Sequence, residues 1–318
     1  MSEVQVDEAA FGELAEQSRR ELRVHCYRLL GSAQEAEDLV QETFLRAWRR
    51  RETYEGRSTF RAWLYKIATN ACLDVLGRRP PLPVAEPDAS PVSVPWLSPC
   101  PATMLDDLVV SRETIELAFL TAVQHLPARQ RAVLVLRDVL GWSAKETAEL
   151  LDSTVASANS ALQRARETMR TRLPARRSEW TAPAGPEELA VVHRYMAALE
   201  SGDEQAIGAM LAEDARCGQA PWAGGNMTDD PHWYTGRSTL VDGWQPILHG
   251  PGRREFRCVP TTANHEPAIA VYIREPGSDG PFEAFGLDVL RVTGGRIAEI
   301  SVFGNENYPL FGLPPTHP

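Results

Sequence analysis

The chain has 318 residues, of which 43% are hydrophobic and 24% charged. This composition is typical of soluble globular proteins, and the length predicts two or three domains. No apolar run approaches the roughly 18 residues that cross a bilayer, and the polar, acidic first residues lack the pattern of a secretory signal. The five cysteines are far apart and form no Cys-x-x-Cys pair. We therefore expect a cytoplasmic protein with reduced, mostly buried thiols, and no disulfide, bound metal or other cofactor.

The net charge of −10 argues against nucleic-acid binding until it is divided along the chain. Residues 1–180 hold 24 Lys and Arg against 25 Asp and Glu, whereas residues 181–318 hold 9 against 18. Almost all of the acidic excess therefore lies in the second part. In the first part the arginines cluster at residues 46–61 and again at 164–177, which predicts surfaces able to bind phosphates.

The N-terminal part is predicted to be mostly helical. Between residues 36 and 48 the apolar side chains recur at helical spacing, with charged and amide side chains on the opposite face. After a break at residues 55–59, a second amphipathic helix is predicted over residues 60–76, ending at Gly77. Eight prolines between residues 80 and 101 exclude a regular helix and indicate a semi-extended linker.

Helical periodicity resumes near residue 111, with interruptions that predict three or four short helices up to about residue 177. Ser143, followed three residues later by Glu146, predicts a capping box at the start of one helix. Small Ala148 would let this helix pack closely on the next one. Residues 152–154 would make a tight turn between the two, so the segment predicts a helix-turn-helix.

The second helix of this motif is predicted from residue 155 to about residue 169. Short polar side chains near its N-terminus suit base edges in a major groove, and arginines further along suit phosphates. The residues that we expect to contact DNA are Ser157, Asn159, Ser160, Gln163, Arg164 and Arg166. Taken alone, the segment is equally compatible with a plain helical hairpin that has a solvated basic face.

After about residue 180 the chain changes character. Residues 181–186 form a second linker, and residues 187–213 predict a helix. Four later segments favour β-strands, at residues 255–260, 268–274, 282–292 and 296–303, with a hairpin turn at residues 292–296. The sequence therefore predicts a multidomain protein, all-α in its N-terminal part and α+β in its C-terminal part.

Four motifs follow one another in the helical part, at residues 37–45, 60–70, 126–131 and 164–166. In this order they resemble regions 2 and 4 of the extracytoplasmic-function group of sigma-70 factors. The resemblance implies two all-α sigma domains that bring core RNA polymerase to promoter DNA and perform no chemistry of their own. It places region 2, which reads the −10 element, at residues 9–80 and the Pro-rich linker at residues 81–110. Region 4, whose helix-turn-helix reads the −35 element, is placed at residues 111–178.

The same resemblance assigns contacts by position. It implies the β′ clamp helices and the β flap as contact sites on core RNA polymerase. The residues that match the surface docking on the clamp helices are Asp38, Gln41, Glu42 and Leu45. The residues that match the part capturing a base flipped from the −10 element are Tyr54, Arg57, Phe60, Arg61 and Asn70. Single-stranded bases need aromatic or polar pockets beside a cationic surface, which these residue types supply; for nearby Trp63 we favour core packing.

Looser motifs mark the C-terminal part, at residues 195–203, 211–215, 233–237 and 294–300. They resemble the SnoaL-like branch of the NTF2-like superfamily, an α+β cone around a pocket, here at residues 187–318. The order of region 2, linker, region 4 and this domain resembles the SigJ/SigG type of these factors. That type implies a fused domain that contacts the sigma domains and modulates them in cis. The domain would take over part of the role that a separate anti-sigma protein plays elsewhere.

The candidate pocket residues of this domain are Trp233, Tyr234, His265 and Asp288. Asp288 lies in a predicted strand, so its carboxyl group could face the inside of the cone, where apolar walls raise a pKa. No motif ties any two of these residues together, and we expect no enzyme. Two alternatives stay open. One is a one-component regulator with a helix-turn-helix and a ligand-binding domain, and the other is a SnoaL-like hydrolase or isomerase dependent on Asp288 or His265.

Overall fold

The computed structural model describes residues 8–54, 59–80, 82, 90–105, 114, 116–173 and 185–318. By its internal contacts the chain divides into two compact units. The helical unit consists of residues 1–88 and 104–175, and the C-terminal unit of residues 89–103 and 176–318. None of the described helices is long and apolar enough to cross a membrane.

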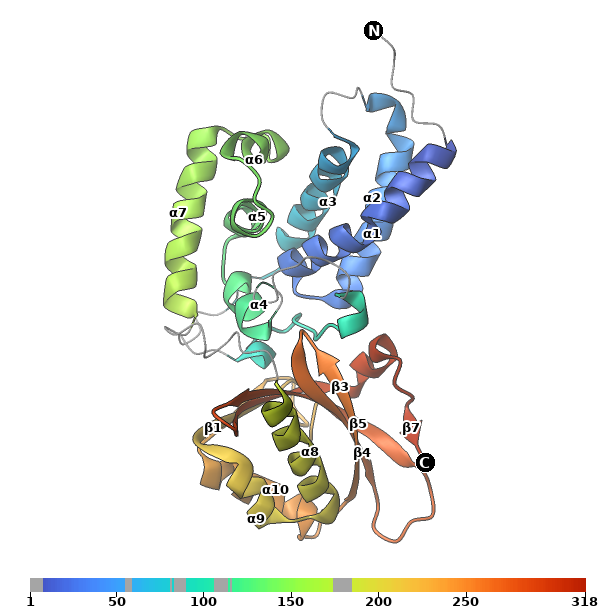
Figure 1. Ribbon diagram of the computed structural model, residues 1–318, viewed down its shortest axis with the longest axis vertical. Coiled ribbons are helices and arrows are strands. Elements are labelled where there is room, and N and C mark those ends of the chain that lie inside the picture. Colours follow the sequence, from blue (N-terminus) through green and yellow to red (C-terminus); the bar gives the residue numbers. More distant parts are fainter. Residues whose placement is uncertain are drawn as a thin grey trace. The chain divides into compact units, whose positions relative to one another are not determined.

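Three helices form the first part of the helical unit (Figure 1): α1 (Glu8–Leu30), α2 (Ala33–Arg49) and α3 (Phe60–Leu76). A short 3-10 turn, η1 (Arg51–Thr53), follows α2. Ser32 and Thr59 cap the N-termini of α2 and α3, because each side chain accepts a hydrogen bond from a backbone N–H three residues on. The helices bury their apolar faces together and leave Leu22, Val40 and Leu64 fully enclosed. The helices predicted in this part are confirmed.

The second part of the helical unit contains α4 (Leu117–Gln124), α5 (Ala128–Leu134), α6 (Ala144–Leu150) and α7 (Val155–Arg172). Helix α5 continues as a π-helical stretch, Val135–Val139, before the chain turns at Gly141, whose φ is 71°. Helices α4 and α5 contact α1, and helices α5 and α6 contact α3. The two parts of the helical unit are therefore in direct contact.

The C-terminal unit is a curved mixed sheet with helices on one face (Figure 1). The covering helices are α8 (Pro186–Ser201), α9 (Glu204–Met210) and α10 (Arg237–Leu248). The strands are β1 (Leu211–Gln219), β2 (His232–Thr235), β3 (Glu255–Ala263), β4 (Glu266–Arg274), β5 (Phe282–Thr293) and β6 (Arg296–Gly304). They follow the order β2-β1-β6-β5-β4-β3, in which β1 and β6 pair in parallel and the other neighbours antiparallel.

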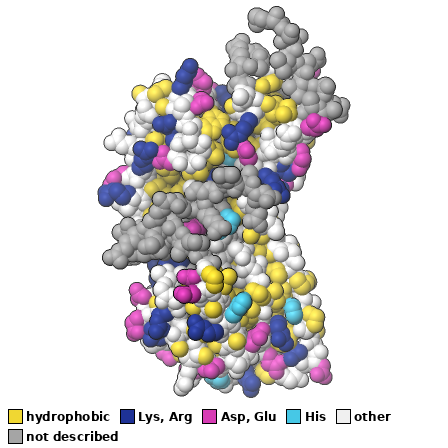
Figure 2. Space-filling model, viewed as in Figure 1, with side chains coloured by type: hydrophobic (Ala, Val, Ile, Leu, Met, Phe, Trp, Pro, Cys, Tyr) yellow, Lys and Arg dark blue, Asp and Glu magenta, His cyan; other side chains and the backbone are white. Residues whose placement is uncertain are grey.

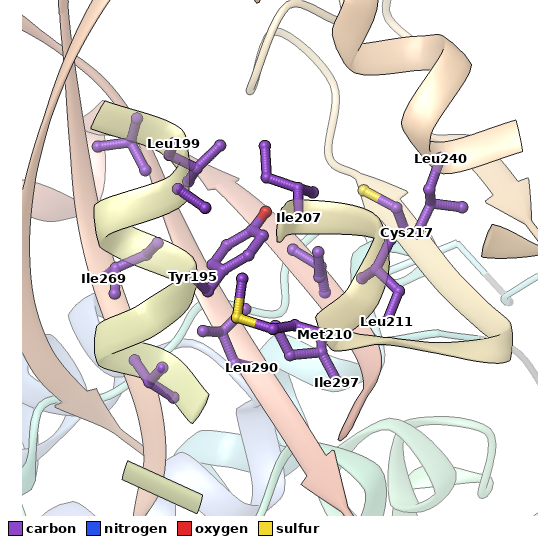
Figure 3. Close-up of a cluster of buried hydrophobic side chains, with 14 of the residues drawn as sticks. Tyr195, Leu199, Ile207, Met210, Leu211, Cys217, Leu240, Ile269, Leu290 and Ile297 are labelled. Atoms are coloured by element: carbon purple, nitrogen blue, oxygen red, sulfur yellow. The ribbon is translucent and has the colours of Figure 1, made fainter. Parts of the chain in front are cut away.

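Apolar side chains between the helices and the sheet form the core of this unit (Figure 3). Tyr195 and Leu199 of α8 and Ile207 of α9 meet Ile269 and Leu290 of the sheet, and all five are completely buried. Each large apolar side chain buried in this way stabilises the fold by about 1.5–3 kcal/mol. The α+β architecture predicted for this part is confirmed.

One predicted element of this unit is wrong. The single helix expected over residues 187–213 is two helices, because Gly202 takes a left-handed conformation (φ 69°) that ends α8. From Leu211 the chain belongs to strand β1, where residues 212–216 show no strand pattern in the sequence and pair with β2 and β6. The other four β-segments are confirmed, as is the hairpin turn, at Gly294 and Gly295. The five cysteines are buried, as predicted.

The end of the chain crosses the sheet and pairs with it. The stretch η7 (Asn305–Phe311) follows β6, and β7 (Thr316–His317) pairs with the start of β5. The hydroxyl group of Tyr308 lies 2.6 Å from the carbonyl oxygen of Val271 and 2.9 Å from that of Gly286, beside the bulge between β4 and β5. These contacts make the last residues an integral part of the C-terminal unit.

The described part of the Pro-rich linker up to Thr103 also belongs to the C-terminal unit. Its 3-10 turn η2 (Pro91–Ser93) contacts β1 and β6. Val92 approaches the backbone of Gly218 so closely that an added methyl group there would lie 2.9 Å from it. Further along, the backbone N–H of Cys100 donates to the side-chain oxygen of Asn264, and the N–H of Asn264 donates to the carbonyl oxygen of Cys100, both at 2.9 Å. The linker is thus held at two places on the sheet.

Candidate nucleic-acid interface

Helices α6 and α7 form the predicted helix-turn-helix. Ser143 and Glu146 make the capping box that begins α6, since each side chain accepts a hydrogen bond from the other's backbone N–H. Asp152 turns the chain in a left-handed conformation (φ 47°), and the side chain of Thr154 caps α7. Ala148 is buried, and helices α6 and α7 are in contact.

One face of α7 is buried in the helical unit, through Ala158, Leu162, Ala165 and Met169. The opposite face is open to solvent. All the predicted DNA-contacting residues lie there and are exposed: Ser157, Asn159, Ser160, Gln163, Arg164 and Arg166. In the view of Figure 2, Lys and Arg side chains lie along the flank of the helical unit formed by α6 and α7. The helix therefore presents a polar and basic surface, as base edges and phosphates require.

The two central arginines of this surface differ in their partners. Arg166 donates two hydrogen bonds, of 2.8 and 2.7 Å, to the carboxylate of Asp138 in the π-helical stretch. Such a bidentate pair holds the guanidinium in one orientation and neutralises part of its charge. Arg164 makes no ion pair with any residue that the structure describes. Arg164 is therefore the more available of the two for a nucleic acid.

Aromatic rings gather at one end of region 2. The ring of Phe60 packs against those of Phe11, Tyr54 and Trp63 with centroids 5.7 Å apart, and Trp48 packs against Phe11 at 5.2 Å. Phe11 is buried, whereas the other four rings are partly exposed. The cluster is thus both a piece of core and an accessible aromatic surface. The local sequence around Tyr54 and Phe60 does not indicate Phe11, because Phe11 lies about 40 residues away in the chain.

The polar residues predicted to contact the −10 strand are spread along α3. Arg61 at its start is exposed and donates to Glu21 of α1 at 2.6 Å. Asn70 lies more than two turns further on and is half-buried. Arg57, the remaining predicted residue, lies outside the described residues. The structure therefore brings Tyr54, Phe60 and Arg61 to one end of α3 and leaves Asn70 apart from them.

A stripe of side chains on α2 contains the residues predicted to contact polymerase: Asp38, Gln41, Glu42 and Leu45. Their spacing of three, four and seven residues places them on one face of the helix. Asp38, Gln41 and Leu45 are exposed, and Glu42 is paired with Arg46 at 2.7 Å. Leu45 is 52% exposed, so its apolar side chain is accessible at the end of this stripe.

Regions 2 and 4 meet through polar contacts that the sequence had not indicated. Arg131 of α5 is 4% exposed and donates to the carbonyl oxygen of Leu29 at the end of α1. The rings of Tyr65 in α3 and Trp142 before α6 lie 5.4 Å apart. The ammonium group of Lys66 lies 2.7 Å from the carboxylate of Asp152 in the helix-turn-helix. The regions that would read two separate DNA elements are therefore packed on each other.

The candidate pocket of the C-terminal unit centres on one buried acid. Asp288 in β5 lies opposite Ile269 and Val302 of the neighbouring strands, which belong to the core under the helices. It is 2% exposed, and burial raises the pKa of its carboxyl group from 3.8 to about 7. Its Oδ2 atom has no hydrogen-bond partner among the described residues, and neither has the hydroxyl group of Tyr195.

The other candidate pocket residues lie elsewhere. Trp233 and Tyr234 are exposed on the short edge strand β2, and His265 lies in the turn between β3 and β4 with a positive φ of 62°. The structure thus encloses Asp288 but does not gather the four residues around one place. Among the described residues, no group of His, Cys, Asp and Glu is arranged to hold a metal ion.

Each part of the chain matches a family of known proteins. A model of sigma-70 region 2 matches residues 14–79, a model of sigma-70 region 4 matches residues 116–169, and a SnoaL-like domain matches residues 192–300. The ECF RNA polymerase sigma factor SigG of Mycobacterium tuberculosis is 38% identical over 323 residues, which covers 96% of this chain and 84% of that protein. The ECF RNA polymerase sigma factor SigW of Bacillus subtilis is 29% identical over 171 residues, which covers 52% of this chain and 90% of that protein.

Among solved structures, the crystal structure of the extracytoplasmic function sigma factor SigJ of Mycobacterium tuberculosis covers 96% of this chain and 99% of its own. The TM-score is 0.61 and the sequence identity 22%. At this identity the likeness is one of fold. It extends over both units of the chain.

Proposed function

Because the chain belongs to the extracytoplasmic-function family of RNA polymerase sigma factors, we propose that its SnoaL-like domain controls initiation in cis by holding the linker between regions 2 and 4. As a member of this family the chain directs RNA polymerase to promoters and is not an enzyme. The control that we assign to the fused domain acts on this activity. We place the protein in the cytoplasm, where polymerase and promoter DNA are found.

The contacts with polymerase and DNA follow the surfaces described above. The exposed stripe of α2 with Leu45 at its end docks on the β′ clamp helices, and region 4 also reaches the β flap. The solvent face of α7 reads the −35 element, with Arg164 as its principal cation. The aromatic cluster around Tyr54 and Phe60, with Arg61, receives a base of the −10 element, since partly exposed rings provide stacking surfaces for single-stranded bases.

The packing of region 4 on region 2 is incompatible with simultaneous reading of both elements. The −35 and −10 elements are separate segments of the promoter, and along B-DNA each base pair between them adds about 3.4 Å to the distance between the two sites. In the helical unit, by contrast, α5 and α6 contact α3 directly. The helical unit therefore has the geometry of the free protein, and polymerase must separate the regions to use them.

The observation that carries the proposal is the attachment of the linker to the sheet. Separating regions 2 and 4 requires the linker to extend, and residues 90–103 group with the C-terminal unit instead. The reciprocal hydrogen bonds of Cys100 and Asn264 and the close approach of Val92 to Gly218 hold it there. Each of these hydrogen bonds makes a net contribution of about 1 kcal/mol to the stability of the attached linker. Release of the linker is then a step that the fused domain opposes.

The two alternatives raised by the sequence have less support. A one-component regulator needs no polymerase-binding region 2, yet that region matches its family model over residues 14–79. A hydrolase or isomerase would need a second polar group beside Asp288. The structure does not bring His265 to Asp288 as such a partner, because His265 lies in the turn between β3 and β4.

Run-off transcription with purified core polymerase on a library of genomic fragments tests the proposal. The wild-type chain is compared with Asn264→Gly, which keeps the left-handed backbone of that residue (φ 55°) but removes the amide that holds Cys100. Asn305→Ala is the matched control, because it removes a side-chain hydrogen bond to Ala284 that does not involve the linker.

We expect start sites at the same promoters for all three proteins, with more transcript from Asn264→Gly than from the wild type or Asn305→Ala. Equal yields from all three would contradict control through the linker. If no protein gave specific starts and none bound core polymerase, the contacts proposed for regions 2 and 4 would have to be abandoned as well.

A further inference from the structure

Lys66 occupies a position on α3 that the contacts proposed so far do not use. It lies one turn after Trp63 and one turn before Asn70, so the three side chains share a face of the helix. Trp63 belongs to the aromatic cluster, and Asn70 is one of the residues that the sequence resemblance matches to the −10 contact. An ammonium group between an aromatic surface and a base-contacting amide is placed where the phosphates of a bound single strand would run.

In the helical unit this ammonium group contacts oxygen atoms of region 4. Its Nζ lies 2.7 Å from the carboxylate of Asp152 and 3.4 Å from the carbonyl oxygen of Glu149. Both acceptors come from the end of α6 and the turn before α7. The helix-turn-helix thus supplies oxygen ligands to a cation of region 2.

The ion pair of Lys66 and Asp152 is suited to exchange of one anionic partner for another rather than to stabilising the fold. The side chains of Lys66 and Asp152 are 40% and 71% exposed, and exposed ion pairs of this kind are weak. Asp152 takes a left-handed backbone conformation in the turn. A carboxylate and a phosphate are both anionic oxygen ligands, and an ammonium is a compact point charge that binds either.

We propose that Lys66 is a phosphate contact of region 2 for the −10 strand and that Asp152 occupies it while regions 2 and 4 are packed together. The helix-turn-helix turn and the promoter strand then compete for one ammonium group. This inference rests on the proposed function, because it takes region 2 as the part that holds the −10 strand.

The experiment measures formation of the open promoter complex by the full-length chain with core polymerase, at a series of salt concentrations. Lys66→Gln removes the charge and keeps a side chain of similar length. Asp152→Asn removes the competing carboxylate, and asparagine accepts the left-handed backbone. Glu149→Gln is the matched control, since it removes a carboxylate at the end of α6 whose side chain pairs with Lys145 and not with Lys66.

For Lys66→Gln we expect weaker complexes and a plot of log K against log salt whose slope is smaller in magnitude by about 0.7, the value for one single-strand phosphate. For Asp152→Asn we expect complexes to form about two- to fivefold faster, the range that an exposed ion pair allows. Glu149→Gln should match the wild type. In the double variant the gain from Asp152→Asn should vanish, because both changes act on the same ammonium.

An unchanged salt slope for Lys66→Gln would overturn the phosphate contact, and equal rates for Asp152→Asn and Glu149→Gln would overturn the competition. Run-off transcription by the wild-type chain distinguishes these two outcomes from a failure of the proposed function. Specific starts from the wild type with an unchanged slope refute only the role of Lys66, whereas the absence of specific starts refutes the proposed function itself.

Discussion

The guanidinium group of Arg131 in α5 donates a hydrogen bond of 2.5 Å to the carbonyl oxygen of Leu29, in the last turn of α1. It also donates to both the side chain and the backbone of Gln124 and to the carbonyl oxygen of Leu126. Burial lowers its pKa from 12.5 to about 9. Carbonyl oxygens at a helix C-terminus carry partial negative charge, so the end of α1 receives a cation of region 4.

Replacing Arg131 by methionine should loosen this contact. Four hydrogen bonds are lost and their oxygen acceptors stay behind, which should lower the free energy of unfolding by about 1–3 kcal/mol and increase the separation of regions 2 and 4. Spin labels attached to Arg49→Cys and Glu167→Cys, both at exposed positions, would report that distance by double electron–electron resonance. The label should react selectively there, because the five native cysteines are buried.

The control is Arg129→Met in the same helix, whose guanidinium donates to Leu151 within region 4. This variant should keep the wild-type distance distribution. If Arg131→Met also kept it, the contact with Leu29 would not hold the regions together.

Leu45→Ser should weaken binding to core polymerase about tenfold or more, because an exposed leucine on a binding stripe contributes buried apolar area only in the complex. The fold should be unaffected, since the side chain is already 52% exposed. Leu189→Ser removes a leucine that is 44% exposed on α8 and is the matched control. Affinity measured by fluorescence anisotropy should fall for Leu45→Ser alone; equal affinities would remove Leu45 from the interface.

Arg164→Ala should reduce recognition of the −35 element by about 1–3 kcal/mol if the guanidinium contacts a base. Arg166→Ala should reduce recognition of the −35 element by a smaller amount, because Asp138 already holds the guanidinium of Arg166 at 2.7 and 2.8 Å. Competition between matched and mismatched −35 duplexes for the holoenzyme measures both. A larger loss for Arg166→Ala would reverse the assignment of the principal cation.

Asp288→Asn should stabilise the C-terminal unit more at high pH than at low pH. The carboxyl pKa of about 7 in the folded state exceeds the ordinary 3.8, so the fold favours the protonated acid. Wild-type stability therefore decreases as pH rises from about 4 to about 7 and stays reduced above that. At about 1.4 kcal/mol per pH unit, the gain from Asp288→Asn should grow by about 3 kcal/mol between pH 5 and pH 8.

Thermal melts of the full chain at pH 5 and pH 8 would measure this difference. Asp279→Asn, at an exposed position of the same unit, should show no growth of its effect with pH. A gain for Asp288→Asn that did not change with pH would mean that the carboxyl group is ionised in the folded state at both values.

Local patterns in the sequence were sufficient to predict the helices of regions 2 and 4. The helical period placed Ser157 to Arg166 on one surface, and Ser143 with Glu146 marked the start of α6, because side-chain spacing and capping act within a few residues. Strand β1 escaped prediction for the same reason, since its sequence has no local strand pattern and its partner β6 lies some 80 residues away.

The contacts that join distant residues depended on the tertiary structure. Arg131 and Leu29 are 102 positions apart, and Cys100 and Asn264 are 164 apart. Asp138, in the π-helical stretch, meets Arg166 of α7, 28 positions further along the chain. Sequence alone thus determined which surfaces exist, through the period of the backbone. Which of them are covered, paired or free was decided only when distant segments packed together, because burial and ion pairing depend on neighbours that the local pattern does not contain.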